Sequence, residues 1–273
     1  MAVVVDRDNL SKNPLKAGIW GAIYQTTRGP RRTCTAVKKY KLRDDADVTV
    51  VQHGIQRLLS KNLDHIYVSP ILDSWTEGLS IFVATEWYDG NLTDWVSSEY
   101  NDSDTARLEV CQQISSGIAY LHGQGLTHGN LRPSNVLYKS THTPGEFKIQ
   151  LSDYGLERLF SRGANDEWPV PEIVNGSSKN ADKSSDMFLV GCLFLYVFTG
   201  LQPYGLNVAE NVKNGSLAVD PSIVGPELLE TVKFLLNTNN KLRIKASLLK
   251  EQAALKSIFL EEKEDHEILN RLF

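Results

Sequence analysis

Short runs of alternating hydrophobic and polar residues fill the first ninety positions of the chain. The runs that are rich in β-branched and aromatic residues span residues 21–27, 33–40 and 79–88. Turn-forming residues interrupt them, as at Arg28-Gly29-Pro30 and Glu77-Gly78. Alternation with this composition predicts β-strands.

Apolar residues three and four positions apart, the spacing of a helix, occur once inside this strand-rich part and dominate the rest of the chain. The predicted helices span residues 48–63, 103–122, 184–200, 226–236 and 244–259. The third of these is expected to open at Ser184-Ser185-Asp186 and to close at Gly200. We therefore expect a small, strand-rich unit and a larger helical unit that meet near Tyr88-Asp89-Gly90. A ligand pocket is expected at such a junction.

The longest apolar run covers residues 187–201. It is shorter than the roughly 20 residues that a membrane-spanning helix needs, so a helix of the protein core is the better interpretation. The first ten residues, MAVVVDRDNL, carry a charge after five positions and lack the apolar stretch of a signal peptide. No membrane association is expected.

Composition and charge narrow the class further. The chain has 273 residues, 41% of them hydrophobic and 23% charged, which suits a globular protein of one large domain or two lobes. A net charge of −4 gives no reason to expect nucleic-acid binding. Cys34, Cys111 and Cys192 lie far apart and form no CxxC pair, which argues against disulfides and a zinc site and favours a reducing, cytoplasmic compartment.

Several short motifs then occur in one characteristic order. They are "KAGIWGAIY" (16–24), "TAVKKY" (35–40), "HGNLRPSNVL" (128–137), "SDYGL" (152–156), "VPE" (170–172), "SSDMFLVGCLF" (184–194) and "LRIKASLL" (242–249). In this order the chain resembles the protein-kinase superfamily along nearly its whole length. The resemblance implies an α+β, bilobal protein-kinase fold: a small lobe over residues 1–88, a helical lobe over 89–260, and a tail over 261–273.

A closer resemblance is to the kinase-like domain of the inositol-requiring kinase-endoribonucleases and their relative RNase L. It rests on "GEFKIQLSDYGLERL", "EWPVPE", "VGCLFLYVFTGLQPYG" and "DGNLTDWV". Those relatives carry a ribonuclease domain after the kinase-like unit, and only a short tail follows that unit here. In that family the kinase-like unit serves as a nucleotide-sensing dimerisation platform.

The kinase resemblance implies a site for ATP or another nucleotide, with Mg²⁺ as a further cofactor. Lys38 would contact the phosphates, and Asn135 and Asp153 would hold the metal. The remaining nucleotide-binding positions are Gly18, Gly21, Ile23, Ala36, Thr85, Glu86, Tyr88 and Leu137. The resemblance also implies structural roles: Asp186 anchors the catalytic loop, His128 packs beneath Tyr154, and Glu172 pairs with Arg243.

The chain departs from the kinase pattern where the chemistry takes place. Asn130 stands where a kinase has the aspartate that accepts the proton of the attacking hydroxyl, and an amide cannot take that proton. The first glutamate of the chain is Glu77, beyond the predicted small-lobe helix, so Lys38 lacks its usual partner. An aspartate just before that helix could replace it only with an unusual geometry.

Smaller departures accompany these two. Lys16 replaces the first glycine of the glycine-rich loop, and Arg132 replaces the lysine of the catalytic loop. Gly129 replaces the arginine that reads a phosphorylated activation loop. Between Tyr154 and the VPE motif, Ser161 is the only hydroxyl-bearing residue. Activation by phosphorylation of the usual kind is therefore not expected.

Three functions remain open from the sequence. The first is an inactive or severely impaired kinase-like domain, a pseudokinase that acts as a scaffold or allosteric regulator and binds nucleotide. The second is a weakly active Ser/Thr protein kinase, since Lys38, Asn135 and Asp153 are retained. The third is a protein-binding module whose nucleotide site stays empty. The expected partner is another protein, either an active kinase or a second copy of the chain.

Overall fold

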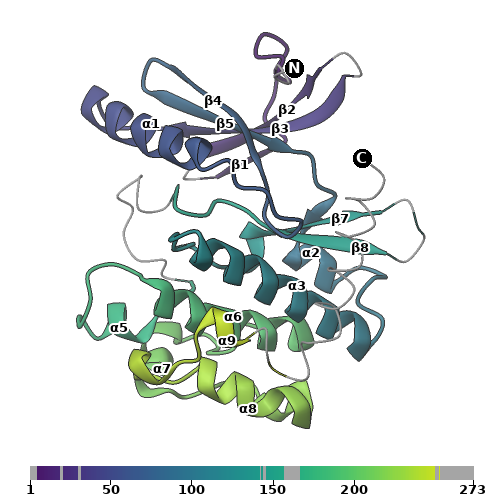
Figure 1. Ribbon diagram of the computed structural model, residues 1–273, viewed down its shortest axis with the longest axis vertical. Coiled ribbons are helices and arrows are strands. Elements are labelled where there is room, and N and C mark those ends of the chain that lie inside the picture. The colour runs from purple at the N-terminus through teal and green to yellow at the C-terminus, as the bar shows by residue number, and fades with distance from the viewer. Residues whose placement is uncertain are drawn as a thin grey trace.

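The computed structural model describes residues 5–18, 21–29, 32–141, 143, 146–156, 167–249 and 252. Within these ranges the chain forms a five-stranded antiparallel sheet with one long helix against it, a small three-stranded sheet, and a helical region (Figure 1). This is the bilobal α+β protein-kinase fold that the sequence predicted. The small sheet lies between the five-stranded sheet and the helices (Figure 1).

The five-stranded sheet has the strand order β1-β2-β3-β5-β4. Its strands are β1 (Lys16–Gly18), β2 (Gly21–Arg28), β3 (Thr33–Lys41), β4 (Ile71–Glu77) and β5 (Ser80–Glu86). The three predicted strands are confirmed as β2, β3 and β5, although β5 ends two residues earlier than expected. The sequence missed β4 because its polar residues, Asp73, Ser74 and Thr76, interrupt the alternation.

Register divides the side chains of this sheet between two faces. Lys38 lies opposite Ile23 on β2 and Val83 on β5, and Ala36 lies opposite Thr85. Directly opposed residues share a face of an antiparallel pair, so these side chains all lie on the inner face, toward the rest of the molecule. Val37, one position away from Lys38, packs in the outer-face cluster instead.

The N-terminal segment covers the outer face of the sheet. Val5 is buried there in a cluster with Trp75 and Phe82, whose rings stack with centroids 5.0 Å apart. Arg7 lies over the Trp75 ring and forms an ion pair with Asp73 of β4, with a shortest distance of 2.7 Å. Residues 5–10 therefore act as a strap that keeps two large aromatic rings away from water.

Helix α1 (Asp45–Ser60) packs against this sheet. It begins three residues before the predicted start because the side chain of Asp44 caps it by accepting a hydrogen bond from the backbone N–H of Asp47. It also ends three residues early, just before Asn62, whose φ of 45° lies in the left-handed region. Its buried face consists of Val51, Ile55 and Leu58.

The chain leaves the first sheet at Glu86 and joins the second at Gly90. This three-stranded sheet has the order β6-β7-β8, with β6 (Gly90–Asn91), β7 (Val136–Ser140) and β8 (Phe147–Leu151). The sequence did not predict it, because its strands are too short to give a clear alternation. Val68, which follows α1, bridges to Leu151 of β8 and so ties the two parts of the molecule together.

In the helical region the predicted helices over 103–122, 184–200 and 226–236 are confirmed as α3, α6 and α8, whereas the short helices α2, α5 and α7 were not predicted. Its α-helices are α2 (Leu92–Val96), α3 (Asp104–Gly123), α5 (Pro171–Val174), α6 (Lys183–Thr199), α7 (Val208–Asn214), α8 (Pro226–Leu235) and α9 (Ala246–Leu249). Short 3₁₀ turns occur at Pro133–Asn135, Pro221–Val224 and Asn240–Leu242. The predicted helix over 244–259 is described only as α9, and the residues beyond 252, including the tail over 261–273, lie outside the described part.

Helix α6 is the centre of the core. Its N-cap is Asp182, two residues before the predicted opening, because the Asp182 carboxylate accepts hydrogen bonds from the backbone N–H groups of Ser184 and Ser185. Most of its residues are buried, and Gly200, with φ 68°, ends it as expected.

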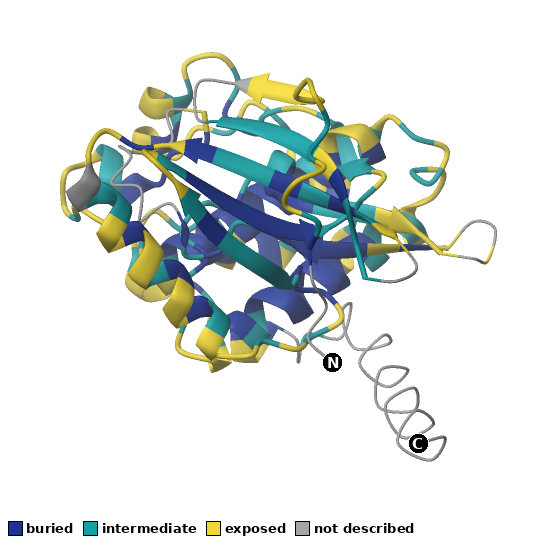
Figure 2. Cartoon of the chain, turned by 90° about the horizontal axis from the view of Figure 1, so that it is seen from above, coloured by how far each residue is buried: buried dark blue, intermediate teal, exposed yellow. Residues whose placement is uncertain are grey.

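Within the described ranges, none of the helices has the length and hydrophobicity of a membrane-spanning segment. Seen from above, exposed residues gather on the outer sides of the helices and buried ones behind them (Figure 2).

Replacing Gly117 of α3 with alanine is expected to destabilise the fold by about 1–3 kcal/mol, because the interior has no room for a further methyl group. A Cβ there would lie 2.7 Å from the carbonyl oxygen of Tyr67 and 3.0 Å from a methyl group of Leu151. Urea unfolding measures the change. Gly123→Ala, at the end of the same helix with open space around it, is the matched control and should not destabilise. Equal stabilities of the two variants would contradict the packing argument.

Candidate functional site

Lys38 and Asp153 form an ion pair beneath the five-stranded sheet. The Lys38 Nζ donates to both carboxylate oxygens of Asp153, at 2.7 and 2.8 Å. The side chains are only 13% and 18% exposed, so the pair is largely shielded from water. The predicted phosphate-binding group and one predicted metal ligand therefore lie together, and each neutralises the other.

The turn that carries Asp153 is fixed on several sides. Asp153 has a φ of 61°, a left-handed conformation that costs a residue with a Cβ roughly 1–3 kcal/mol and persists only where the surroundings hold it. The backbone N–H of Gly155 donates to the carbonyl of His128 at 2.8 Å, and that of Ser152 donates to the carbonyl of Asn135 at 2.9 Å. The Tyr154 hydroxyl donates to the carbonyl of Ser69 at 3.0 Å.

No residue of α1 pairs with Lys38 among the side chains that the structure describes. Asp44 caps the helix, and Asp47 forms an ion pair with Arg43 at 3.1 Å. The face of α1 that packs against the core is apolar, with Ile55 fully buried at its middle. The carboxylate that pairs with Lys38 among the described residues is that of Asp153.

Asp186 holds residues 128–137, the segment that matches the catalytic loop of kinases, as the resemblance implied. Its side chain is fully buried. Its carboxylate accepts the backbone N–H groups of His128 at 2.8 Å and Gly129 at 2.9 Å. The Nε2 of His122, which sequence reasoning did not single out, lies 2.8 Å from the same carboxylate. A buried charge with this many donors is stabilised by them and fixes the loop's path.

His128 is buried beside Asn130. Burial lowers the pKa of the His128 imidazole, so the ring is neutral near pH 7. Its Nδ1 accepts the backbone N–H of Asn130 at 3.3 Å, which assigns the proton to Nε2. Nε2 has no hydrogen-bond partner within the described ranges. The side-chain amide of Asn135 donates to the carbonyl of Asn130 at 2.8 Å, so Asn130 and Asn135 are joined in one loop structure.

The predicted adenine-binding residues lie on two sheets. Ile23, Ala36 and Thr85 share the inner face of the five-stranded sheet, and Leu137 lies on β7 of the small sheet. Thr85 is buried and its hydroxyl donates to the carbonyl of Glu86 at 3.2 Å, while Ile23, Ala36 and Leu137 are half-buried. Partly exposed apolar side chains of this kind suit contact with a flat, apolar ligand.

The segment between the two sheets is held by its side chains. Glu86 forms an ion pair with Arg28 of β2 at 3.0 Å, and the Tyr88 hydroxyl donates to the Oγ of Ser69 at 2.8 Å. Burial raises the pKa of Tyr88 and also that of Tyr154. Ser69 thus binds one tyrosine through its side chain and the other through its carbonyl. Sequence reasoning missed Ser69, because a lone serine in a loop gives no signal.

Gly18 and Gly21 flank the turn between β1 and β2 and lie directly opposite each other. A side chain is excluded at Gly21, where φ is 153° and a Cβ would lie 2.1 Å from the carbonyl oxygen of Lys39. Residues 19 and 20, which follow Gly18 in the sequence, lie outside the described part. Gly21 therefore has a structural reason to be glycine that is independent of phosphate binding.

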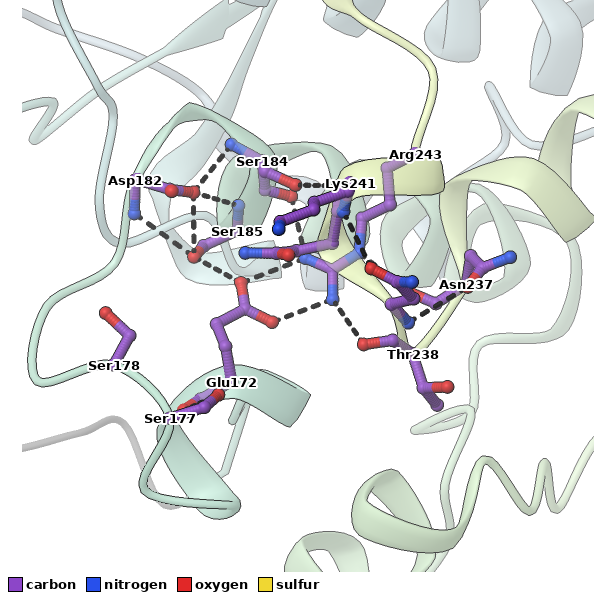
Figure 3. A network of polar contacts seen from close by, with 12 residues as sticks. Glu172, Ser177, Ser178, Asp182, Ser184, Ser185, Asn237, Thr238, Lys241 and Arg243 are labelled. Carbon is purple, nitrogen blue, oxygen red and sulfur yellow. Dashed lines mark hydrogen bonds and ion pairs between the residues drawn. The ribbon is translucent and has the colours of Figure 1, made fainter.

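Glu172 and Arg243 form a buried network in the helical region (Figure 3). The two terminal guanidinium nitrogens of Arg243, Nη1 and Nη2, donate to the two carboxylate oxygens of Glu172, at 2.9 and 2.7 Å. Ser185 donates its hydroxyl to the same carboxylate. Burial by itself would raise the pKa of Glu172, but the hydrogen bonds from Arg243 and Ser185 hold it below its ordinary value. The predicted pairing of these residues is confirmed.

Arg132, which replaces the lysine of the kinase catalytic loop, lies near an acidic residue. The nearest charged atoms of Arg132 and Glu167 are 3.8 Å apart. Ser161, the single hydroxyl-bearing residue between Tyr154 and the VPE motif, lies outside the described residues.

Within the described part, no group of three or more His, Cys, Asp or Glu side chains could hold a metal ion. The three cysteines are free, as expected.

The chain is similar to known proteins over most of its length. The family model described as "Protein kinase domain" matches residues 11–255. The chain is 28% identical over 177 residues to the probable serine/threonine-protein kinase fhkC of Dictyostelium discoideum, which covers 60% of this chain and 29% of the relative. It is 24% identical over 255 residues to calcium-dependent protein kinase 3 of Plasmodium yoelii yoelii, covering 88% and 46%.

The similar proteins also include the serine/threonine-protein kinase/endoribonuclease ire-1 of Caenorhabditis elegans. That match is 29% identical over 157 residues and covers 51% of this chain and 16% of the relative. Among solved structures, the twitchin kinase region from C. elegans has a TM-score of 0.73 at 20% identity, covering 91% of this chain and 45% of that one. The chain thus spans less than half the length of these relatives.

Proposed function

We propose that this chain, which belongs to the protein kinase domain family, is a pseudokinase: it binds a nucleotide, transfers phosphate poorly or not at all, and acts as a scaffold or allosteric regulator. The observation that carries this proposal is the joint state of Asn130 and Lys38. Asn130 cannot accept a proton, and Lys38 forms its ion pair with Asp153. An active kinase has a proton-accepting aspartate at the position of Asn130, and its strand lysine pairs with a glutamate of the small-lobe helix.

The loss of the proton acceptor has a definite expected size. A positioned general base contributes about 10²–10⁴ in rate. The Asn130 side chain can orient a hydroxyl by hydrogen bonding but cannot take its proton. The contacts of Asn130 support a structural role, because its backbone N–H donates to the Nδ1 of His128 and its carbonyl accepts from the side-chain amide of Asn135.

Retention of nucleotide binding is supported by the remaining groups. Lys38 supplies an ammonium group beneath the sheet, and the half-buried apolar residues Ile23, Ala36 and Leu137 suit a purine ring. As oxygen donors, Asn135 and Asp153 have the right chemistry for Mg²⁺. In this structure the carboxylate of Asp153 is neutralised by Lys38, which donates to both of its oxygens, so a Mg²⁺ ion would compete with the ammonium for that carboxylate.

A weakly active Ser/Thr protein kinase is the second candidate. The observation in its favour is that Lys38, Asp153 and the Asn130–Asn135 loop lie in one connected site. Placement of charged groups alone can leave some catalysis. The third candidate, a binding module with an empty site, is separated from both by a direct test of nucleotide binding.

The proposed partner is another protein, an active kinase or a second copy of this chain, in the cytoplasm. The similarity to the ire-1 relative, whose name joins a kinase to an endoribonuclease, supports the idea of a kinase domain that controls another activity. The acidic net charge of −4 supports neither a nucleic-acid nor a membrane partner.

Two measurements on the purified chain test this proposal. A saturable rise of the melting temperature with ATP, measured with and without Mg²⁺, is expected if the site binds nucleotide. No transfer of radiolabelled phosphate to itself or to a general substrate is expected above the level of the Asp153→Ala variant. Transfer that is clear in the unsubstituted chain and lost in Asp153→Ala would favour the weakly active kinase. No thermal shift under any condition would favour the empty module.

A further inference from the structure

We propose that the Lys38 ammonium takes the place of a divalent cation beside Asp153, so that the site binds its nucleotide without metal. This inference rests on the proposed nucleotide binding and specifies the form of the ligand: a nucleotide phosphate free of Mg²⁺. It follows from the ion pair of Lys38 and Asp153 and from the lack of any other acidic partner for Lys38 among the described residues.

The first step concerns the donors of Lys38. An ammonium group has three N–H donors, and two of them are directed to the two oxygens of Asp153. The third remains for a phosphate oxygen. A nucleotide can therefore join the existing pair without breaking it, and Lys38 then bridges the carboxylate and the phosphate, which is what a bound cation does in a metal-dependent site.

The second step is that Asp153 cannot easily move to meet a metal elsewhere. Its turn is tied to residues 128–135 by two backbone hydrogen bonds, from Gly155 to the His128 carbonyl and from Ser152 to the Asn135 carbonyl. The Tyr154 hydroxyl ties it to Ser69. A metal ion could therefore bind Asp153 only by displacing the Lys38 ammonium from the position that it occupies.

The third step is the state of Lys38 after such a displacement. In an active kinase the lysine would then be held by a glutamate of the small-lobe helix. Here the core-facing side of α1 is apolar, and its described acidic residue, Asp47, pairs with Arg43. Displacement would remove the carboxylate partner that Lys38, largely shielded from water, has among the described residues, and would leave it the nucleotide phosphate alone.

The arrangement reverses the expected effect of removing the Asp153 charge. In a metal-dependent site this carboxylate attracts the cation that binds the phosphates, so its loss weakens binding. In the arrangement proposed here it repels the phosphates and occupies two donors of Lys38. Asp153→Asn should therefore tighten the binding of metal-free ATP by about tenfold, the factor that corresponds to 1.4 kcal/mol.

Isothermal titration calorimetry of ATP against the full chain tests this, first in EDTA and then in excess Mg²⁺. The unsubstituted chain should bind ATP in EDTA, and Mg²⁺ should not tighten the binding. Asp153→Asn should tighten it in EDTA, and Lys38→Met should abolish it. Asp73→Asn is the matched control: it breaks the Arg7–Asp73 ion pair on the outer face of the same sheet, where it should leave ATP affinity unchanged.

The outcomes separate this inference from the proposed function. Binding that is strongly tightened by Mg²⁺ and lost in Asp153→Asn would overturn the inference and leave nucleotide binding intact. A lack of ATP binding by the chain and by Asp153→Asn, in both buffers, would overturn the proposed nucleotide binding itself. Circular dichroism melting curves identify any variant that fails to fold, and in that case the comparison of the unsubstituted chain in EDTA and Mg²⁺ decides alone.

Discussion

Replacement of Arg243 by methionine is expected to lower the free energy of unfolding by about 3–5 kcal/mol, the usual effect of removing one partner of a buried ion pair. The Arg243 side chain has no exposed surface, and it gives Glu172 two direct hydrogen bonds. Without it, Glu172 would keep the hydroxyl of Ser185 but carry an uncompensated buried charge. Since single domains are stable by roughly 5–15 kcal/mol, urea unfolding should show the loss clearly.

The electrostatic explanation also predicts how the loss of unfolding free energy in Arg243→Met changes with pH. The pKa of Glu172 is lowered in the folded state, so the network contributes stability above the carboxyl pKa of the unfolded chain. That contribution is lost as the pH falls through the folded-state pKa. The difference in the free energy of unfolding between the unsubstituted chain and Arg243→Met should therefore become smaller in acid. Lys233→Met, which breaks an exposed pair with Glu230, should show little change at any pH. A constant gap for Arg243→Met would contradict the electrostatic explanation.

Asn130→Asp alone is expected to leave phosphoryl transfer well below that of an active kinase, even though a general base is worth about 10²–10⁴ in rate. The substitution supplies a proton acceptor at the right position of a loop that Asp186 already holds in place. It does not change Lys38, whose ammonium stays on Asp153 because α1 offers it no described partner. The phosphates and the attacking hydroxyl would then still not be positioned together.

A radiolabelled-phosphate assay of Asn130→Asp beside the unsubstituted chain checks this. Asn130→Ala is the matched variant that removes the side-chain amide without adding a carboxylate. Similar, near-background transfer by all three proteins is the expected result. Robust transfer by Asn130→Asp would show that the ion pair between Lys38 and Asp153 opens readily and does not limit the chemistry.

The sequence was a good guide to the fold where a pattern or a motif extends over many residues. Helices α3, α6 and α8 were predicted to within a residue or two, because α3 and α6 begin at side-chain caps, α8 begins at a proline, and each has many apolar residues at helical spacing. The pairing of Glu172 with Arg243, 71 positions apart, came from the family resemblance. No periodicity could have indicated it.

The parts that were missed depend on tertiary contacts. Strand β4 is half polar and gains its place from β5 on one side and from Arg7, which reaches its Asp73 across the outer face. The site was predicted as a set of residues, but the partner of Lys38 was not. An absent glutamate shows only which pair cannot form, and the position of Asp153 depends on a turn held by Tyr154 and Ser69. Such a turn cannot be read from local sequence.

The strap over the outer face bears on how the protein should be prepared. Similarity to the kinase family begins at residue 11, but Val5 and Arg7 lie before that point. A recombinant chain trimmed to the family boundary would uncover the stacked rings of Trp75 and Phe82 and leave Asp73 without its guanidinium partner. A freshly exposed aromatic surface of this kind promotes self-association in the test tube. An oligomer seen with a trimmed chain would therefore say nothing about the natural partner.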